Sequence, residues 1–121
     1  MKKILYIEDE ADQVMMLETR LKASGYKCLS ALDGEEGYRL ACEEKPDLIL
    51  LDILLPKMNG YELTYSLKNN GATKHIPIIV VTASGAKALE KKCLELGIEE
   101  IIHKPYDSAY LSERIAHYLG R

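Results

Sequence analysis

The sequence lacks any apolar run long enough to cross a membrane as a helix, which takes about 18 or more residues. Its longest apolar stretch covers residues 48–56 and is interrupted by Asp52. It also lacks a CxxC pair, because its three cysteines, Cys28, Cys42 and Cys93, are widely spaced. An odd number of scattered cysteines is typical of reduced residues in the cytoplasm rather than of redox-active ones.

The sequence also has no excess of basic over acidic residues. The 16 Lys and Arg residues and 19 Asp and Glu residues give a net charge of −3, whereas a dedicated nucleic-acid binder usually has a basic patch. The acidic residues 8–10 follow the basic N-terminus too soon to leave room for the apolar core of a signal peptide. We therefore predict a cytoplasmic protein that binds neither a membrane nor, directly, nucleic acid.

The length of the chain, 121 residues, is that of one domain, since typical domains have about 100–150 residues. Hydrophobic residues make up 47% and charged residues 29% of it, close to the averages of globular proteins, which argues against disorder. A chain of this size buries roughly two-thirds of its surface on folding. We predict a single domain over residues 1–121, with no output domain attached to it.

Short apolar runs alternate with amphipathic stretches along the chain. The apolar runs predict strands at 3–7, 26–31, 47–52, 76–82 and 98–102. The amphipathic stretches predict helices at 11–24, 35–44, 59–69 and 86–96, and a last helix capped by Asp107. Five strand–helix units in this order predict an α/β fold, in which helices cover both faces of a parallel sheet.

Polar side chains stand where several of these strands end. Glu8 and Asp9 follow the first strand, Asp52 ends the third, Thr82 ends the fourth, and Lys104 follows the fifth. In an open parallel sheet the carboxyl ends of the strands meet at one edge, and ligands bind outside that edge. We therefore expect these five side chains to form one site.

Three carboxylates held close together repel one another, which raises the pKa of at least one of them. A hard divalent cation relieves this repulsion, and Mg²⁺ commonly binds one or two carboxylates together with phosphate and water oxygens. With Lys104 as a fixed positive charge and the Thr82 hydroxyl as a donor, the site suits a phosphoryl group in transfer. Its nucleophile would be a carboxylate that forms an acyl phosphate.

The strand-end motifs resemble those of the receiver domains of two-component response regulators. They are ILYIEDE at 4–10, LILLDILLPKMNGYEL at 48–63, IPIIVVTA at 76–83 and HKP at 103–105. Each motif alone is weak, but the four occur in order, each at a strand end, and cover essentially the whole chain. The resemblance implies a flavodoxin-like doubly wound (βα)5 fold with strand order 2-1-3-4-5.

The resemblance also implies a metal site and its ligands. Asp9 would bind Mg²⁺ directly, and Glu8 would bind it through water. Asp52 and the backbone carbonyl of Leu54 would complete the protein ligands.

For the phosphoryl group, the resemblance makes Asp52 the acceptor. The donor would be a phosphohistidine on a sensor histidine kinase or a histidine phosphotransfer protein. Thr82, the backbone N–H of Ala83 and Lys104 would bind the phosphoryl oxygens, and Pro105 would follow Lys104 through a cis peptide bond.

One position departs from the family pattern. Receiver domains usually have Tyr or Phe three residues before the lysine, where this sequence has Ile101. We expect the switch and its output to involve Thr82, Ile101, Pro105 and Tyr106, on the face made by the fourth helix, the fifth strand and the fifth helix. The resemblance further implies a phosphorylation switch that turns over no external substrate, as a monomer or a weak dimer linked to phosphorylation.

Two other functions need residues that this sequence lacks. An aspartate-nucleophile phosphatase of the haloacid dehalogenase type needs a second acid two residues after the nucleophile, where this sequence has Leu54. A flavin-binding domain needs a phosphate loop after the first strand, where residues 8–10 would repel a phosphate. A third alternative stays open: Ile101 favours a receiver fold that acts as an interaction module without being phosphorylated.

Overall fold

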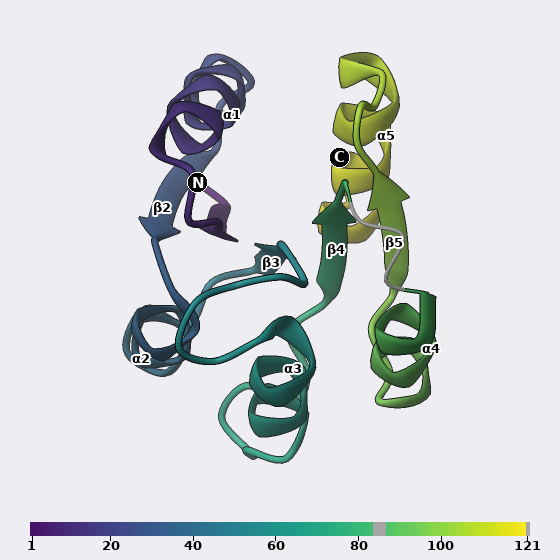
Figure 1. Ribbon diagram of the computed structural model, residues 1–121. Helices are drawn as coiled ribbons and strands as arrows, with labels where there is room; N and C mark the ends of the chain where they lie inside the picture. The colour runs from purple at the N-terminus through teal and green to yellow at the C-terminus, as the bar shows by residue number, and fades with distance from the viewer. Residues whose placement is uncertain (84–86, 121) are drawn as a thin grey trace.

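The computed structural model describes residues 1–83 and 87–120, in which five strands alternate with five helices (Figure 1). The strands are β1 (Lys3–Ile7), β2 (Lys27–Ala31), β3 (Leu48–Leu51), β4 (Ile78–Thr82) and β5 (Glu100–His103). The helices are α1 (Ala11–Ala23), α2 (Gly34–Glu44), α3 (Gly60–Lys68), α4 (Lys87–Glu95) and α5 (Ser108–Leu119). None of the helices in this described part is both long and apolar enough to span a bilayer.

The strands form one parallel sheet in the order β2-β1-β3-β4-β5. Helices α1 and α5 lie over one face of the sheet, and α2, α3 and α4 lie over the other (Figure 1). The predicted α/β, flavodoxin-like doubly wound fold and its strand order are therefore confirmed. The chain turns from one side of β1 to the other between β2 and β3, and this reversal places the ends of β1 and β3 side by side.

Two hydrophobic clusters fill the spaces between the sheet and its two helix layers, because successive side chains of a strand point to opposite faces. Leu50 and Val81 belong to the cluster under α1 and α5, whereas Leu51 and Val80 belong to the other. All four residues of β3 are buried. A strand buried on both faces reads as a continuous apolar run, as predicted for this segment.

The helix boundaries follow from local capping. The side chain of Asp107 accepts hydrogen bonds from two backbone N–H groups of the first turn of α5, as predicted. Asn59 and Glu62 form a capping box at the start of α3. Gly25 and Gly97 follow α1 and α4 with φ angles of 90° and 101°, a conformation that glycine adopts without strain.

Four strands differ from their predicted bounds, β2 by a single residue at its start, β3 by a single residue at each end, and β4 and β5 by two residues at their start. β4 begins at Ile78 rather than at residue 76, since Pro77 has no N–H to donate to the sheet and offers its carbonyl to Ile49 instead. β5 covers Glu100–His103 rather than 98–102, and His103 pairs with Thr82 at its end. This shift brings Lys104 directly onto the carboxyl edge of the sheet. Ala86, the predicted first residue of the fourth helix, lies outside the described residues.

Candidate functional site

Three of the predicted residues meet at the carboxyl edge of the sheet. The Nζ atom of Lys104 lies 2.6 Å from Glu8 Oε1 and 3.3 Å from Asp52 Oδ2. These residues lie 96 and 52 positions from Lys104 in the sequence, at the ends of β1, β3 and β5. The structure thus joins the ends of three strands through a single ammonium group.

Backbone hydrogen bonds hold each of these residues to the sheet. The N–H of Glu8 donates to Ala31, that of Asp52 to Ile7, and that of Lys104 to Thr82, with N–O distances of 2.9–3.0 Å. In each case the residue that follows a strand still forms the backbone hydrogen bond that would continue its pairing with the neighbouring strand. The side chains of the site therefore start from backbone that is as fixed as the sheet itself.

Burial and the neighbouring charges shift the pKa values of Glu8 and Lys104 in opposite directions. Glu8 is 1% exposed, and the Lys104 and Asp52 side chains are each 13% exposed. Burial raises the pKa of the Glu8 carboxyl above its ordinary value, although the hydrogen bond from Lys104 lowers it. Desolvation lowers the pKa of Lys104, but its hydrogen bond to Glu8 and the charges of Glu8 and Asp52 outweigh that effect and raise it.

Tyr6, on β1, also binds the buried carboxylate, because its hydroxyl donates to Glu8 Oε1 at 3.2 Å. Burial raises the pKa of this hydroxyl, so it stays protonated and remains a donor. We expect Tyr6→Phe to lower the free energy of unfolding by about 1–2 kcal/mol, since a buried carboxylate loses a hydrogen bond. Urea denaturation measures this, with Tyr110→Phe, which changes an exposed ring, as the control. Equal stability of the two variants would contradict the assignment.

Asp9 lies apart from this buried group and is exposed to solvent. Within residues 1–83 and 87–120, no three Asp, Glu, His or Cys side chains gather closely enough to hold a metal ion. The expected gathering of three carboxylates is therefore not what the structure shows. Lys104 instead forms an ion pair with each of Glu8 and Asp52. Asp52 Oδ1 accepts a hydrogen bond from the Leu54 N–H at 3.1 Å.

The donor set of these residues fits a hard cation in its chemistry. The carboxylates of Glu8, Asp9 and Asp52 and the carbonyl of Leu54 are all oxygen ligands, which Mg²⁺ prefers. Asp9 and Leu54 are exposed to solvent, whereas Ile53, between Asp52 and Leu54, is buried. Binding there would require Asp9 to turn toward Asp52.

The other predicted residues line the edge around this centre. Thr82 is buried at the end of β4, and its backbone carbonyl holds Lys104, whereas Ala83 is exposed. The Lys104–Pro105 peptide bond is cis, as predicted. Ile101 packs against the cluster under α3 and α4, and Tyr106 against the cluster under α1 and α5. These two switch candidates therefore face opposite layers of the fold.

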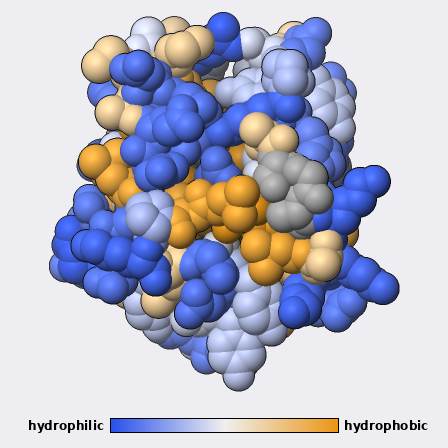
Figure 2. All heavy atoms as spheres, in the orientation of Figure 1, coloured by the Kyte–Doolittle hydropathy of each residue, from blue (hydrophilic) through white to orange (hydrophobic). Residues whose placement is uncertain are grey.

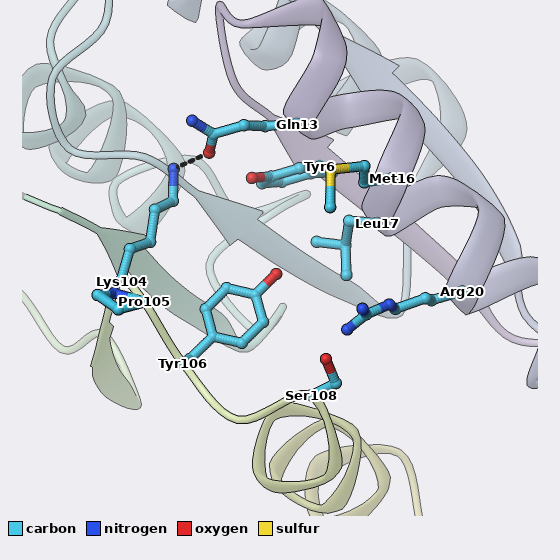
Figure 3. Close-up of a pocket in the computed structure, with 9 residues that line it drawn as sticks. All are labelled: Tyr6, Gln13, Met16, Leu17, Arg20, Lys104, Pro105, Tyr106 and Ser108. Carbon is cyan, nitrogen blue, oxygen red and sulfur yellow. Dashed lines mark hydrogen bonds between the residues drawn. The ribbon is translucent and has the colours of Figure 1, made fainter.

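A residue that the sequence analysis missed reaches this site from α1. Gln13 Oε1 accepts a hydrogen bond from Lys104 Nζ, and both side chains line a pocket of about 290 Å³ (Figure 3). Gln13, Met16, Leu17 and Arg20 line one wall of the pocket, and Lys104, Pro105, Tyr106 and Ser108 line the wall opposite, with Tyr6 between them. The sequence does contain a signal for Gln13. It stands four residues, about one helical turn, after Asp9, and this spacing places it on the side of the helix that faces the site.

Hydrophobic atoms form a band across the middle of the face seen in Figure 2, with hydrophilic atoms above and below it. Among the described residues, the large hydrophobic side chains that remain exposed include Leu32, which follows β2, and Leu54, which follows β3. Leu54 is 53% exposed. An apolar side chain thus stands two residues from Asp52 at the surface.

Comparison with known proteins places these features in a family. The family model of the response regulator receiver domain matches residues 4–116. The chain is 38% identical over 119 residues to the polar-differentiation response regulator DivK of Brucella anthropi, which covers 98% of this chain and 97% of that protein. It is also 38% identical to the phosphate regulon transcriptional regulatory protein PhoB of Pseudomonas aeruginosa, but spans 52% of its length.

Solved structures agree in fold. The receiver domain of the sensor histidine kinase PA1611 from Pseudomonas aeruginosa PAO1, with a magnesium ion coordinated in its active-site cleft, has a TM-score of 0.90. It is 28% identical and covers 99% of this chain and 98% of its own. A CheY-like receiver domain protein from Methanospirillum hungatei has a TM-score of 0.93 at 28% identity, and covers 99% of this chain and 94% of its own.

Proposed function

The chain belongs to the response regulator receiver domain family of two-component signalling, and we propose that it is a switch phosphorylated on Asp52. Residues 1–121 act in this proposal as one receiver domain. A sensor histidine kinase or a histidine phosphotransfer protein supplies the phosphoryl group, and the phosphorylated domain changes its affinity for a protein partner. No external substrate is turned over.

The observation that supports this most is the contact of Lys104 Nζ with both Asp52 and Glu8. The Lys104 and Asp52 side chains are each 13% exposed, and an ammonium group held against a carboxylate can offset negative charge that arrives on it. Asp52 is a suitable acceptor, because its side chain keeps 13% exposure while its backbone is fixed to β1. Glu8 is a poor one, because it is almost completely buried.

In the proposed transfer, a carboxylate oxygen of Asp52 attacks the phosphorus of the donor. A new bond forms between this oxygen and phosphorus, and the bond from phosphorus to the histidine nitrogen breaks. The electron pair of the broken bond stays on the imidazole, which leaves. Thr82, the N–H of Ala83 and Lys104 then bind the phosphoryl oxygens. One N–H of Lys104 changes its acceptor from the Asp52 carboxylate to a phosphoryl oxygen.

Magnesium would be bound directly by Asp9, Asp52 and the carbonyl of Leu54, and through water by Glu8. Its role when bound is to neutralise the carboxylates and the phosphoryl oxygens, which lowers the repulsion between nucleophile and donor. Asp9 contributes by turning from solvent toward Asp52. The magnesium ion in the active-site cleft of the PA1611 receiver domain supports the choice of metal.

The proposed switch spans the residues around Thr82 and Lys104. Thr82 pairs with His103 in the sheet, and Ile101 precedes His103 on the same face of β5. A movement of Thr82 toward a phosphoryl group would therefore reach Ile101, while Pro105 and Tyr106 would follow Lys104. Phosphorylation would favour one of two existing conformations, with a coupling of about 1–3 kcal/mol as is common in allostery.

The direct test is incubation with acetyl phosphate and Mg²⁺, followed by intact mass measurement. We expect the wild type to gain one phosphoryl group and Asp52→Asn to gain none under the same conditions. Asn keeps the size and shape of Asp. The absence of a mass increase in this variant therefore reports on the missing carboxylate and not on folding. A phosphoryl group on the Asn variant would place the acceptor elsewhere.

A long lifetime is expected for the phosphorylated form. The apolar side chain of Leu54, two residues after Asp52, offers no group to orient an attacking water. Ser84, which stands two residues after Thr82 in the sequence, lies outside the described residues. We expect a half-life of minutes or longer in radiolabelled decay, shortened about tenfold by Leu54→Asn. A half-life of a few seconds for the wild type would contradict this.

A second function is favoured by Ile101 alone. Since an aromatic side chain is replaced there by an aliphatic one packed against the core cluster, the domain could serve as an interaction module without phosphorylation. In that case wild type and Asp52→Asn would both keep their mass in acetyl phosphate and Mg²⁺. The same measurement therefore separates the two functions.

A further inference from the structure

Lys104 has three N–H donors on its ammonium group, and the structure gives each of them an acceptor. Two are the carboxylate oxygens of Glu8 and Asp52. The third is the amide oxygen of Gln13, which reaches across the pocket from α1 (Figure 3). The hydrogen-bonding capacity of a side chain that is 13% exposed is thus filled entirely by the protein.

The amide of Gln13 is itself oriented by Glu10, the residue before α1. Gln13 Nε2 donates to Glu10 Oε2 at 2.7 Å. An ionised carboxylate can accept but not donate, so the amide must turn its N–H toward Glu10 and its oxygen toward Lys104. The two residues are three positions apart and lie on one side of the first helical turn, which allows this contact.

We propose that Gln13 is a positioning residue for phosphoryl transfer, which fixes the direction of the Lys104 ammonium group from α1. This inference rests on the proposed role of Asp52. When Asp52 receives the phosphoryl group, one N–H of Lys104 turns to a phosphoryl oxygen, while Glu8 and Gln13 keep the other two. Gln13 suits this place because a neutral amide accepts the hydrogen bond without repelling the phosphoryl group.

The test compares Gln13→Met with the wild type in acetyl phosphate and saturating Mg²⁺. Met keeps the length of the side chain but cannot accept the hydrogen bond. We expect the maximal rate of phosphorylation to fall about tenfold, with little change in the half-saturating concentration of acetyl phosphate, since the lost interaction acts in the transition state. Gln13→Glu keeps an acceptor but adds charge, and should lose only about threefold.

Met16→Leu is the matched control, because Met16 lies on the same helix and lines the same pocket but is not bonded to Lys104. Its rate should stay within about twofold of the wild type. A Gln13→Met rate within twofold of the wild type would overturn the inference while leaving phosphorylation of Asp52 intact. No phosphoryl gain by the wild type would overturn the proposed function and this inference with it.

A second readout needs neither Mg²⁺ nor phosphorylation. In ¹⁵N-labelled protein, exchange of ammonium protons with water can be followed for each lysine by NMR. We expect the protons of Lys104 to exchange about tenfold faster in Gln13→Met, and at the wild-type rate in Met16→Leu. Equal exchange in Gln13→Met and the wild type would show that Gln13 does not hold the ammonium group.

Discussion

Lys104→Met is expected to lower the free energy of unfolding by about 3 kcal/mol at pH 7, the largest loss from any single change at this site. The substitution leaves Glu8 and Asp52 without their shared cation, and breaking a buried ion pair by removing one partner costs about 3–5 kcal/mol. Because Asp52 retains some exposure to solvent, we expect a loss at the lower end of this range of free energies. Urea denaturation of both proteins at pH 7 measures the difference.

The loss of stability caused by Lys104→Met should be smaller at acidic pH. Burial already raises the pKa of Glu8 in the folded wild type above its ordinary 4.5, and removal of Lys104 raises it further. A carboxyl whose pKa is raised by folding favours the folded state below its unfolded pKa, and that contribution is lost as the pH rises through the folded pKa. The difference between variant and wild type should therefore be small at pH 4.5 and grow toward pH 7.

Two further variants test the cause. Glu8→Gln combined with Lys104→Met removes the buried charge and should recover most of the lost stability. Lys22→Met is the matched control, since Lys22 is 61% exposed and pairs with Glu18 on the same helix, so its loss should stay below about 0.5 kcal/mol. A Lys104→Met protein as stable as Lys22→Met would contradict the buried contact.

Gly60→Ala is expected to have the second largest effect, a loss of about 2–3 kcal/mol. A Cβ atom at this position would lie 2.6 Å from the Cα and 2.8 Å from the carbonyl oxygen of Ile53. Both are backbone atoms, and the Gly60 N–H donates to that same oxygen at 2.7 Å. Overpacking of this kind commonly costs about 1–3 kcal/mol, most where the neighbours cannot move aside.

The same change should slow phosphorylation. Ile53 lies between Asp52 and Leu54, so a displaced Ile53 backbone moves both the proposed acceptor and a proposed metal ligand. A misplacement of about 1 Å at a reacting group can cost up to 100-fold in rate, and we expect at least a tenfold slower reaction with acetyl phosphate. Rates are measured well below the denaturation midpoint, so that only folded protein is compared.

Gly71→Ala provides the control for both effects, because an added Cβ there would meet no atom within 4 Å. Its stability should change by less than about 0.5 kcal/mol, and its rate of phosphorylation should match that of the wild type. If Gly60→Ala behaves like Gly71→Ala, the segment after β3 is not held in the way the structure indicates.

The sequence predicted the fold well because its signals are local. The continuous apolar run before Asp52 marks a strand buried on both faces. Asp107 marks a helix start through its side-chain hydrogen bonds, and Gly97 marks a helix end through its positive φ angle. The strand bounds were less predictable. Whether β5 ends at residue 102 or at His103 depends on its pairing with Thr82, which is a property of the sheet and not of the segment.

The site was predictable in its members but not in its contacts. The topology fixes which strand ends meet, so Glu8, Asp52 and Lys104 could be grouped from their positions alone. A lysine side chain, however, can reach several acceptors, and its choice of Gln13, 91 residues away, depends on how α1 packs. The burial of Glu8 and the exposure of its neighbour Asp9 likewise follow from side-chain packing and not from the motif.

The central claim is that Asp52 carries the phosphoryl group, and trapping of the acyl phosphate tests it most directly. Borohydride reduces an aspartyl phosphate to homoserine and leaves an unmodified carboxylate unchanged. After treatment with acetyl phosphate and Mg²⁺, followed by borohydride and peptide sequencing by mass spectrometry, homoserine is predicted at position 52. Homoserine at position 9, or an unaltered Asp52 in a protein that has gained a phosphoryl group, would contradict the account.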